Sequence, residues 1–292
     1  MELGILLGGT GLEIPSWEEG FRLAAEMGYT QVELGGNDVG GGGQKPDLGG
    51  CDEDCARRVV DMAREAGLGV SAVQSHQCFP LADEGALTAS VAHTKRMIDL
   101  AAAAGVAVVH TTTGHRPVGI PEGTMWRMFA DVYRDLLDHA EGKGVKVAIE
   151  PVFVYAVGSL ATTRRFFEVV GREDMYFNYD PSHFPYHDES PVPPILEFGA
   201  RIVHAHAKDA RVEPDPAGEQ RGKEEEMPGG RKFSFAPPGE GVIDHVAVIR
   251  ALKSVGFDGV VSLELGHGVP EPELAARNNV GFMQKVLAEA GA

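Results

Sequence analysis

The chain has 292 residues, a formal net charge of −17 and a hydrophobic share of 43%. This length allows one large domain or two small ones, and the apolar share is sufficient for a hydrophobic core. A strongly acidic surface repels phosphate backbones, so we expect no nucleic-acid partner, although such charge also simply keeps proteins in solution.

The sequence offers no membrane or disulfide signal. The most apolar run, residues 100–109, is too short to span a bilayer, and the first residues lack the basic segment of a signal peptide. The cysteines Cys51, Cys55 and Cys78 are an odd set without a disulfide framework. We therefore expect free thiols, no membrane partner and a cytoplasmic location.

One pattern recurs along the chain: an amphipathic helix, a glycine and a short β-branched strand. Gly28, Gly67, Gly105 and Gly144 stand at nearly equal intervals, and glycine ends helices because it adopts the left-handed conformation without a steric cost. The strands that follow are apolar on both faces, as in a parallel sheet covered by helices. Together with a first strand at residues 3–7, the pattern predicts eight strands alternating with eight helices.

The predicted helices begin near Ser16, Asp52, Thr88, Gly123, Thr162, Val192, Asp244 and Glu271. Strict alternation in a chain of this length predicts a (β/α)8 TIM barrel, an α/β fold in which residues 1–292 form a single domain. A doubly wound sheet is the alternative, but Gly8–Gly11 only weakly resembles the phosphate-binding turn that it requires.

Two segments, Gly35–Gly50 and Arg211–Pro238, interrupt the pattern. The first is rich in glycine, and the second is charged and contains prolines. Both follow predicted strands at the end of the barrel where active sites form, so we expect loop insertions over the active-site face.

Four consecutive predicted strands end in residues that can bind a metal: Glu150, Asp180, His206 and Glu264. In a barrel such strand ends face one pocket. Glu150 and Asp180 each precede a proline and could simply close a strand or a turn, but four ligand types in succession predict a metal site. Three carboxylates and one imidazole suit Mn²⁺, Mg²⁺ or Co²⁺, and Zn²⁺ is also compatible.

The sequence around these residues resembles the xylose isomerase-like superfamily. The motifs are IEP at Ile149–Pro151, DPSH at Asp180–His183, HAKD at His206–Asp209, LEL at Leu263–Leu265 and GEGVID at Gly239–Asp244. The best match is the sugar isomerase/epimerase branch, which includes inosose dehydratase-like and tagatose epimerase-like proteins. The similarity extends over the whole chain in order and spacing, although many activities share these motifs.

The resemblance implies one divalent ion, with Mn²⁺ the first choice, held by Glu150, Asp180, His206 and Glu264. It also implies a homodimer or homotetramer and places His183 near the substrate or the metal. A divalent ion stabilises the enediolate that forms when a sugar C–H proton leaves. Glu150 and Glu264, three strands apart, would remove and return that proton. We therefore expect a metal-dependent sugar or polyol isomerase or epimerase.

The rest of the predicted mouth is also polar. Strand ends carry Glu33, His76 and His110, and His115 and Arg116 follow in the next loop. This pattern favours recognition of hydroxyl groups, hence a small sugar or polyol. The predicted substrate-binding residues are His183, Lys208, His110, His76, Glu33 and Arg116.

Two inward-facing neighbours of His206 have other expected roles. Lys208 shares its strand face and either holds a substrate carboxylate or oxygen, or pairs with Asp209 or Glu264. His204 lies one layer deeper, where we expect a hydrogen-bonded supporting residue.

Three functions are alternatives to an isomerase or epimerase. A dehydratase removes water through the same enolate, so an inosose dehydratase-like lyase stays open. The apurinic-endonuclease branch shares the barrel and ligand types, but it carries an Asp-x-His pair where this chain has Phe233 and Phe235, which opposes a trinuclear centre and DNA cleavage. A barrel kept only as a binding scaffold is weakest, because all four ligands are present.

Overall fold

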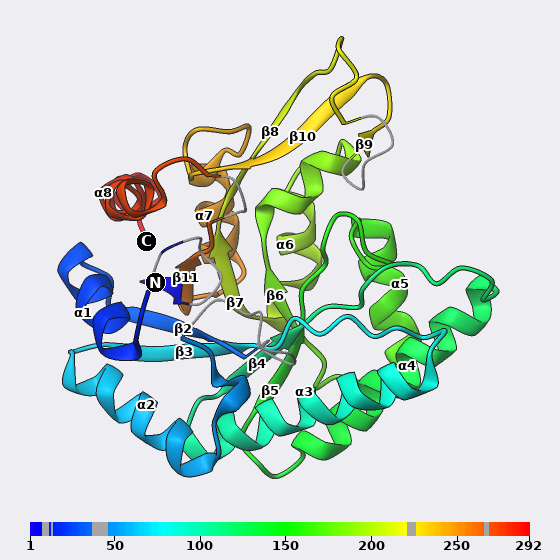
Figure 1. Ribbon diagram of the computed structural model, residues 1–292. Coiled ribbons are helices and arrows are strands. Elements are labelled where there is room, and N and C mark those ends of the chain that lie inside the picture. The colour runs from blue at the N-terminus through cyan, green and yellow to red at the C-terminus, as the bar shows by residue number, and fades with distance from the viewer. Residues whose placement is uncertain (8–11, 13, 37–45, 221–225, 266–268) are drawn as a thin grey trace.

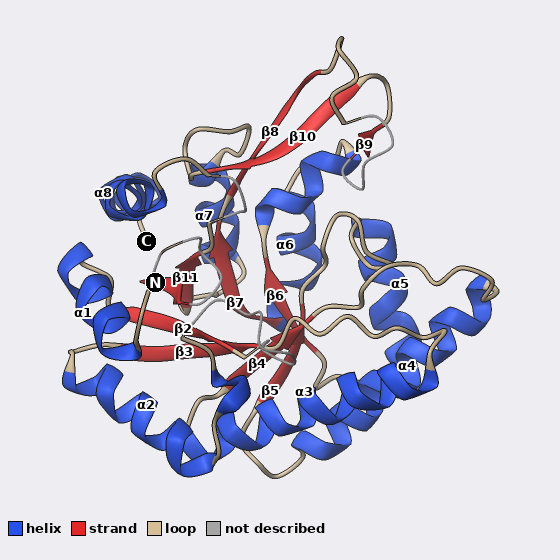
Figure 2. Ribbon diagram, viewed as in Figure 1, coloured by secondary structure: helices blue, strands red, loops and turns tan. Residues whose placement is uncertain are grey.

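A closed barrel of parallel strands forms the centre of the molecule. The computed structural model describes residues 1–7, 12, 14–36, 46–220, 226–265 and 269–292. Within these residues, eight strands close in the order β1-β11-β7-β6-β5-β4-β3-β2, and the helices surround them (Figures 1 and 2). The predicted TIM barrel is confirmed.

The elements alternate as the sequence pattern predicts. The barrel strands are β1 (Glu2–Leu7), β2 (Gln31–Gly35), β3 (Gly69–Gln74), β4 (Val108–Thr111), β5 (Lys146–Ile149), β6 (Tyr176–Tyr179), β7 (Ile202–Ala207) and β11 (Val260–Leu263). The α-helices are α1 (Trp17–Met27), α2 (Glu53–Glu65), α3 (Glu84–Ala104), α4 (Glu122–Ala140), α5 (Leu160–Val170), α6 (Val192–Phe198), α7 (His245–Ser254) and α8 (Pro272–Ala290). None of these described helices has both the length and the apolar character needed to cross a membrane.

Helix α3 begins earlier than predicted, and its cap explains why. It starts at Glu84 rather than near Thr88, because the Asp83 side chain accepts a hydrogen bond from the Ala86 amide. A side-chain oxygen that satisfies a free amide of the first turn fixes where a helix begins. Helix α5 likewise starts at Leu160 behind the cap residue Ser159, ahead of the predicted Thr162.

The inside of the barrel is unusually polar. Along β7, Ala205 and Ala207 belong to the hydrophobic core, whereas His204 and His206 alternate with them and are hydrogen-bonded in a buried polar network. The same period of two separates Phe177 and Tyr179 of β6, which are core residues, from the buried Asn178 between them. The alternation therefore directs polar side chains toward a common centre.

The segment predicted as a loop at Arg211–Pro238 is largely a small antiparallel sheet. Strands β8 (Asp209–Pro214), β10 (Arg231–Ala236) and β9 (Glu226–Met227) pair in the order β8-β10-β9, and Figure 1 shows β8 and β10 rising from the end of β7. Alternating apolar residues explain the difference, since Phe233 packs with Phe153 in a satellite core. Of the other predicted insertion, residues 37–45 lie outside the described residues, and Leu48–Gly50 forms a short 3-10 helix, η1.

Asp209 holds the start of this sheet against the segment before α7. Its buried carboxylate accepts hydrogen bonds from the amides of Gly239, Gly241 and Ile243 and from His245 Nε2, over 3.0–3.2 Å. Gly241 leaves no room for a side chain, because a Cβ there would lie 2.2 Å from Asp209 Oδ1. Asp209 thus links the HAKD and GEGVID motifs. Of the pairings predicted for Lys208, the structure shows the one with Glu264.

The cysteine expectation was wrong for two of the three residues. Cys51 and Cys55 are joined by a disulfide, with their Cα atoms 5.2 Å apart, which is an ordinary separation for bonded cysteines. Cys78 is a free, exposed thiol. The turn that leads into α2 brings the two sulfur atoms together, and spacing alone did not reveal it.

Replacing Asp209 by asparagine should lower the free energy of unfolding by about 3 kcal/mol, because one amide oxygen cannot replace both acceptor oxygens of a buried carboxylate. Burial raises the pKa of Asp209, but its bonds to His245 and to backbone amides lower it overall below the usual value. Its contribution is therefore present above the unfolded-state pKa and is lost as the pH falls through the lower folded-state pKa.

Urea unfolding at several pH values measures this effect. The difference in free energy of unfolding between the wild type and Asp209→Asn should be largest at pH 7 and should decrease in acid. The control Asp61→Asn removes an exposed partner of Arg64 and should change stability by less than about 0.5 kcal/mol. Equal effects of the two substitutions would contradict the assignment.

Candidate metal centre

The four predicted ligands meet at the open end of the barrel. Glu150, Asp180, His206 and Glu264 come from the neighbouring strands β5, β6, β7 and β11, and one ligand atom of each lies within 4.8 Å of the others. His206 Nδ1 lies 3.0 Å from Glu264 Oε2 and 3.6 Å from both Glu150 Oε1 and Asp180 Oδ2. Residues scattered along the sequence therefore surround one small volume.

Several buried polar atoms point into this volume without a hydrogen bond. Within the described part of the chain, Asp180 Oδ2, His183 Nε2 and His206 Nδ1 have no hydrogen-bond partner. Buried polar atoms are normally satisfied, so such a group requires an explanation. A cation at their common centre would satisfy all three once the two imidazole nitrogens that face it carry no hydrogen. The donor set and its orientation therefore fit a divalent metal ion.

The local chain explains the position of Asp180 and His183. Asp180 caps the 3-10 helix η2 (Pro181–His187), where its Oδ1 accepts the Ser182 amide at 2.8 Å, leaving Oδ2 for the centre. The tight turn brings His183 back over the site, with Nε2 3.4 Å from Asp180 Oδ2 and 3.5 Å from Glu150 Oε1. The DPSH motif thus supplies two side chains from one turn.

Lys208 is a buried cation at the edge of the centre. Its Nζ lies 3.1 Å from Glu264 Oε2, 3.6 Å from Asp180 Oδ2 and 4.1 Å from the centroid of the Phe235 ring. Of its two predicted partners, Asp209 and Glu264, Lys208 therefore forms an ion pair with Glu264. Burial raises the pKa of Glu264, but Lys208 and His206 lower it to about 2, so Glu264 is ionised at neutral pH.

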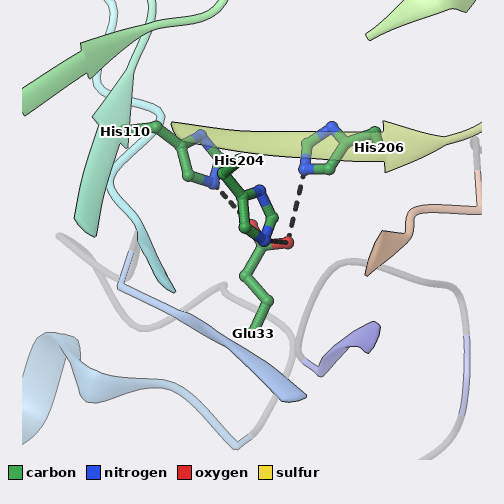
Figure 3. Close-up of side chains that lie close together, drawn as sticks. All are labelled: Glu33, His110, His204 and His206. Carbon is green, nitrogen blue, oxygen red and sulfur yellow. Dashed lines mark hydrogen bonds and ion pairs between the residues drawn. The ribbon is translucent and has the colours of Figure 1, made fainter. Parts of the chain in front are cut away.

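A second polar layer lies beneath the first. Glu33 accepts hydrogen bonds from His110 Nε2 at 2.5 Å and from His206 Nε2 at 3.3 Å, and His204 lies beside them (Figure 3). Glu33 and His110 are completely buried. The structure therefore places these two predicted substrate-binding residues under the site, where they support other side chains.

Asn178 belongs to this layer and was missed by the sequence analysis. Its Nδ2 donates to Glu150 Oε2 at 2.5 Å, while its Oδ1 lies 2.9 Å from His204 Nδ1. His204 is thus a hydrogen-bonded supporting residue, as predicted. The available signal for Asn178 was its position two residues before Asp180, on the same face of β6.

Groups of opposite charge lie close together in the two layers. Burial disfavours ionisation of Glu33 and Glu150, but the neighbouring imidazoles lower the pKa of both carboxyls well below the usual value. Burial likewise opposes charge on His206, but Glu150, Glu33 and Glu264 raise its pKa well above the usual range. In the metal-free protein, protonated histidine therefore supplies the positive charge that the carboxylates demand.

A cavity of about 490 Å³ opens above the centre. Its floor includes Glu150, Glu264, His76, His183 and Lys208, whereas Phe153, Phe233 and Phe235 form an aromatic wall. Phe235 also lies edge-on to His183, with ring centroids 5.6 Å apart. The positions at which the endonuclease branch has an Asp-x-His pair do face the site, but here they carry phenyl rings.

The predicted substrate-binding residues thus separate into groups. His76, His183 and Lys208 line the cavity. Arg116 lies at the surface, where its Nη1 is 3.6 Å from Glu122 Oε1, and it is not part of the described cavity lining. His76 Nε2 additionally lies 3.1 Å from Glu150 Oε2 and from His110 Nδ1, so it connects the floor to the layer beneath.

Comparison with known proteins identifies the family. Residues 21–286 match the family described as "Xylose isomerase-like TIM barrel", and the chain belongs to this family.

One curated relative, the inosose dehydratase of Serratia proteamaculans (strain 568), is 33% identical over 142 residues, which are 48% of this chain and 47% of that protein. The alignment thus spans about half the length of the curated relative.

Solved structures show the same fold over nearly the whole chain. The protein IolI, crystallised with a zinc atom, has a TM-score of 0.74 at 24% identity, covering 99% of this chain and 98% of that one. D-psicose 3-epimerase from Clostridium cellulolyticum H10, crystallised with D-tagatose, has a TM-score of 0.73 at 16% identity, covering 98% and 99%. At these identities the likeness shows a shared fold.

The substitution Lys208→Met should destabilise the metal-free protein by about 3 kcal/mol, because buried carboxylates lose their cation. The pKa of Glu264 should rise from about 2 toward its ordinary value of 4.5, so the variant should have less stability to lose in acid and the gap to the wild type should narrow as the pH falls.

Unfolding in urea with EDTA, from pH 7 downward, tests this expectation. The control Lys95→Met removes a surface partner of Asp135 and should cost less than about 1 kcal/mol. A Lys208→Met protein as stable as the wild type across the pH range would refute the proposed role of the lysine.

Proposed function

We propose that this protein is a divalent-metal-dependent isomerase or epimerase of a small sugar or polyol. The observation that carries the proposal is that buried atoms of Asp180, His183 and His206 have no hydrogen-bond partner among the described residues. They lie beside the carboxylates of Glu150 and Glu264. A protein pays for unsatisfied buried groups in stability, so their arrangement points to a bound cation.

The residues that would hold the ion are Glu150, Asp180, His206 and Glu264. Oxygen ligands with one imidazole suit Mn²⁺ first, and Mg²⁺, Co²⁺ or Zn²⁺ are the alternatives. When bound, the ion would polarise a substrate carbonyl and stabilise the negative charge that develops as the neighbouring C–H bond loses its proton.

Glu150 and Glu264 are the proposed proton-transfer residues. Both line the cavity, and they extend from β5 and β11 on either side of β6 and β7. Neighbouring cationic groups lower the pKa of both carboxyls, so each is ionised before the reaction. One carboxylate would remove a proton from one side of the substrate, and the other, after taking up a proton from solvent, would deliver that proton from the opposite side or to the adjacent carbon.

The remaining cavity residues would bind the substrate. His76, His183 and Lys208 offer polar contacts to hydroxyl oxygens, and the wall formed by Phe153, Phe233 and Phe235 can cover an apolar C–H face of a sugar or polyol. The sheet β8-β10-β9 supplies two of these rings, so we propose that it covers the mouth from one side.

Dehydration is the second candidate reaction. Curated relatives in the part of the chain that aligns are named inosose dehydratase, and loss of water begins with the same proton abstraction. Lys208, close to Glu264, could then protonate a departing hydroxyl group.

Metal analysis and product analysis test the proposal. We expect the purified protein to bind one divalent ion and, with Mn²⁺ added, to turn over a member of a ketose and inosose panel. Proton NMR in D₂O distinguishes the reactions: deuterium at a carbon with unchanged elemental composition indicates isomerisation or epimerisation, whereas loss of water indicates dehydration. Failure to bind any divalent ion would refute the proposal.

The substitutions Glu150→Gln and Glu264→Gln should each reduce deuterium exchange by at least about 100-fold, because each removes a proton-transfer group. Circular dichroism should show that both variants are folded. The control Glu197→Gln, which affects a surface partner of Arg164, should keep wild-type exchange. Near-normal turnover in either site variant would disprove the two-carboxylate assignment.

A further inference from the structure

We infer that Glu33 is a positioning residue that fixes two of the proposed metal ligands at once, His206 directly and Glu150 through His110. This inference rests on the proposed function, because it assigns a role relative to the metal held there. Glu33 itself lies too deep to touch a substrate, being completely buried in the barrel.

The carboxylate of Glu33 connects strands from different parts of the barrel. From β2, its Oε1 lies 2.5 Å from His110 Nε2 on β4, and its Oε2 lies 3.3 Å from His206 Nε2 on β7 (Figure 3). The Glu33 side chain in Figure 3 extends toward the rings of both histidines. Each oxygen therefore accepts a hydrogen bond from a different histidine.

The first consequence concerns the hydrogen on His206. An ionised carboxylate only accepts hydrogen bonds, so the ring nitrogen that faces it carries the hydrogen. When a metal is bound, His206 would be neutral, and with its hydrogen held on Nε2 by Glu33 the lone pair would be on Nδ1. This nitrogen faces Glu264 Oε2, Asp180 Oδ2 and Glu150 Oε1 at 3.0–3.6 Å. Carboxylates that orient metal-binding histidines in this way strengthen metal binding.

The second consequence concerns the orientation of Glu150. His110, held by Glu33 at Nε2, places its Nδ1 3.3 Å from Glu150 Oε2. Asn178 Nδ2 lies 2.5 Å from the same oxygen. Glu150 Oε2 is thus held from below, and Oε1 is the oxygen that faces His206 and His183.

Substitution of Glu33 by glutamine separates this role from simple space filling. The amide has nearly the same shape, but it has one accepting oxygen and one donating nitrogen. In either orientation of this side-chain amide, its NH₂ group faces the N–H group of one of the two histidines. That ring must move its hydrogen or turn away, so either His206 loses the lone pair on Nδ1 or Glu150 loses its support from His110.

The experiment is a calorimetric titration of the 292-residue chain with Zn²⁺ in the presence of a competing chelator. We expect Glu33→Gln to weaken Zn²⁺ binding by about 10- to 100-fold, the usual range for loss of such a partner. Glu33→Asp keeps the charge but is too short to reach both histidines, and it should also lose at least about 10-fold. The matched control Ser71→Ala, which removes a hydroxyl 3.1 Å from His204 Nε2 in the same layer, should stay within about 3-fold of the wild type.

The outcomes separate this inference from the proposed function. If the wild type binds Zn²⁺ and Glu33→Gln binds it equally well, the positioning role is overturned while the proposed function stands. Wild-type affinity in Glu33→Asp would show that charge alone matters and would also overturn it. If the wild type binds none of Zn²⁺, Mn²⁺, Mg²⁺ and Co²⁺, the proposed function and this inference fail together.

A second measurement requires no variant and therefore does not depend on whether Glu33→Gln folds. In ¹⁵N NMR spectra of the Zn²⁺-loaded wild type, His206 should carry its hydrogen on Nε2 and should bind the metal through Nδ1. A hydrogen on Nδ1 of His206 would overturn the inference.

Discussion

The burial of four carboxylates at and beneath the mouth of one barrel is the constraint on which the rest of the structure depends. Glu33, Glu150, Asp180 and Glu264 are each at most 9% exposed, and isolated buried charges are costly unless they are paired. His110, His206 and Lys208 supply the compensating positive charge. A divalent cation at the point where the unpaired atoms converge would add the charge that this arrangement favours.

The same constraint explains the unusual interior of the barrel. The interior of a TIM barrel is normally filled by branched apolar side chains. Here Asn178, His204 and Ser71 join the two histidines that contact Glu33 in a hydrogen-bonded layer. Apolar residues such as Phe177 and Val109 instead face the surrounding helices, so the helices stabilise the fold while the lumen is available for chemistry. The precision of the site thus depends on a polar network rather than on tight apolar packing.

The sequence predicted the fold and the grouping of the four proposed ligands because both follow from simple periodicity. Strand ends in a barrel share one rim, so Glu150, Asp180, His206 and Glu264 had to approach one another once the alternation was recognised. The depth at which other side chains lie in the barrel, and therefore which residues they contact, was not predictable in this way. Glu33 and His110 occupy strand positions that suit either a rim or a buried layer, and only the depth of each strand in the closed barrel places them under the site. The strands of the β8-β10-β9 sheet and the Cys51–Cys55 bond depend on local turns that a single sequence does not specify.

The most direct test of the central claim is anomalous diffraction from a crystal of the wild-type protein grown with Mn²⁺. The account predicts one strong anomalous peak bounded by Glu150, Asp180, His206 and Glu264, with His206 coordinating through Nδ1. A crystal in which these four side chains enclose no peak, or in which the ion binds elsewhere, would contradict it.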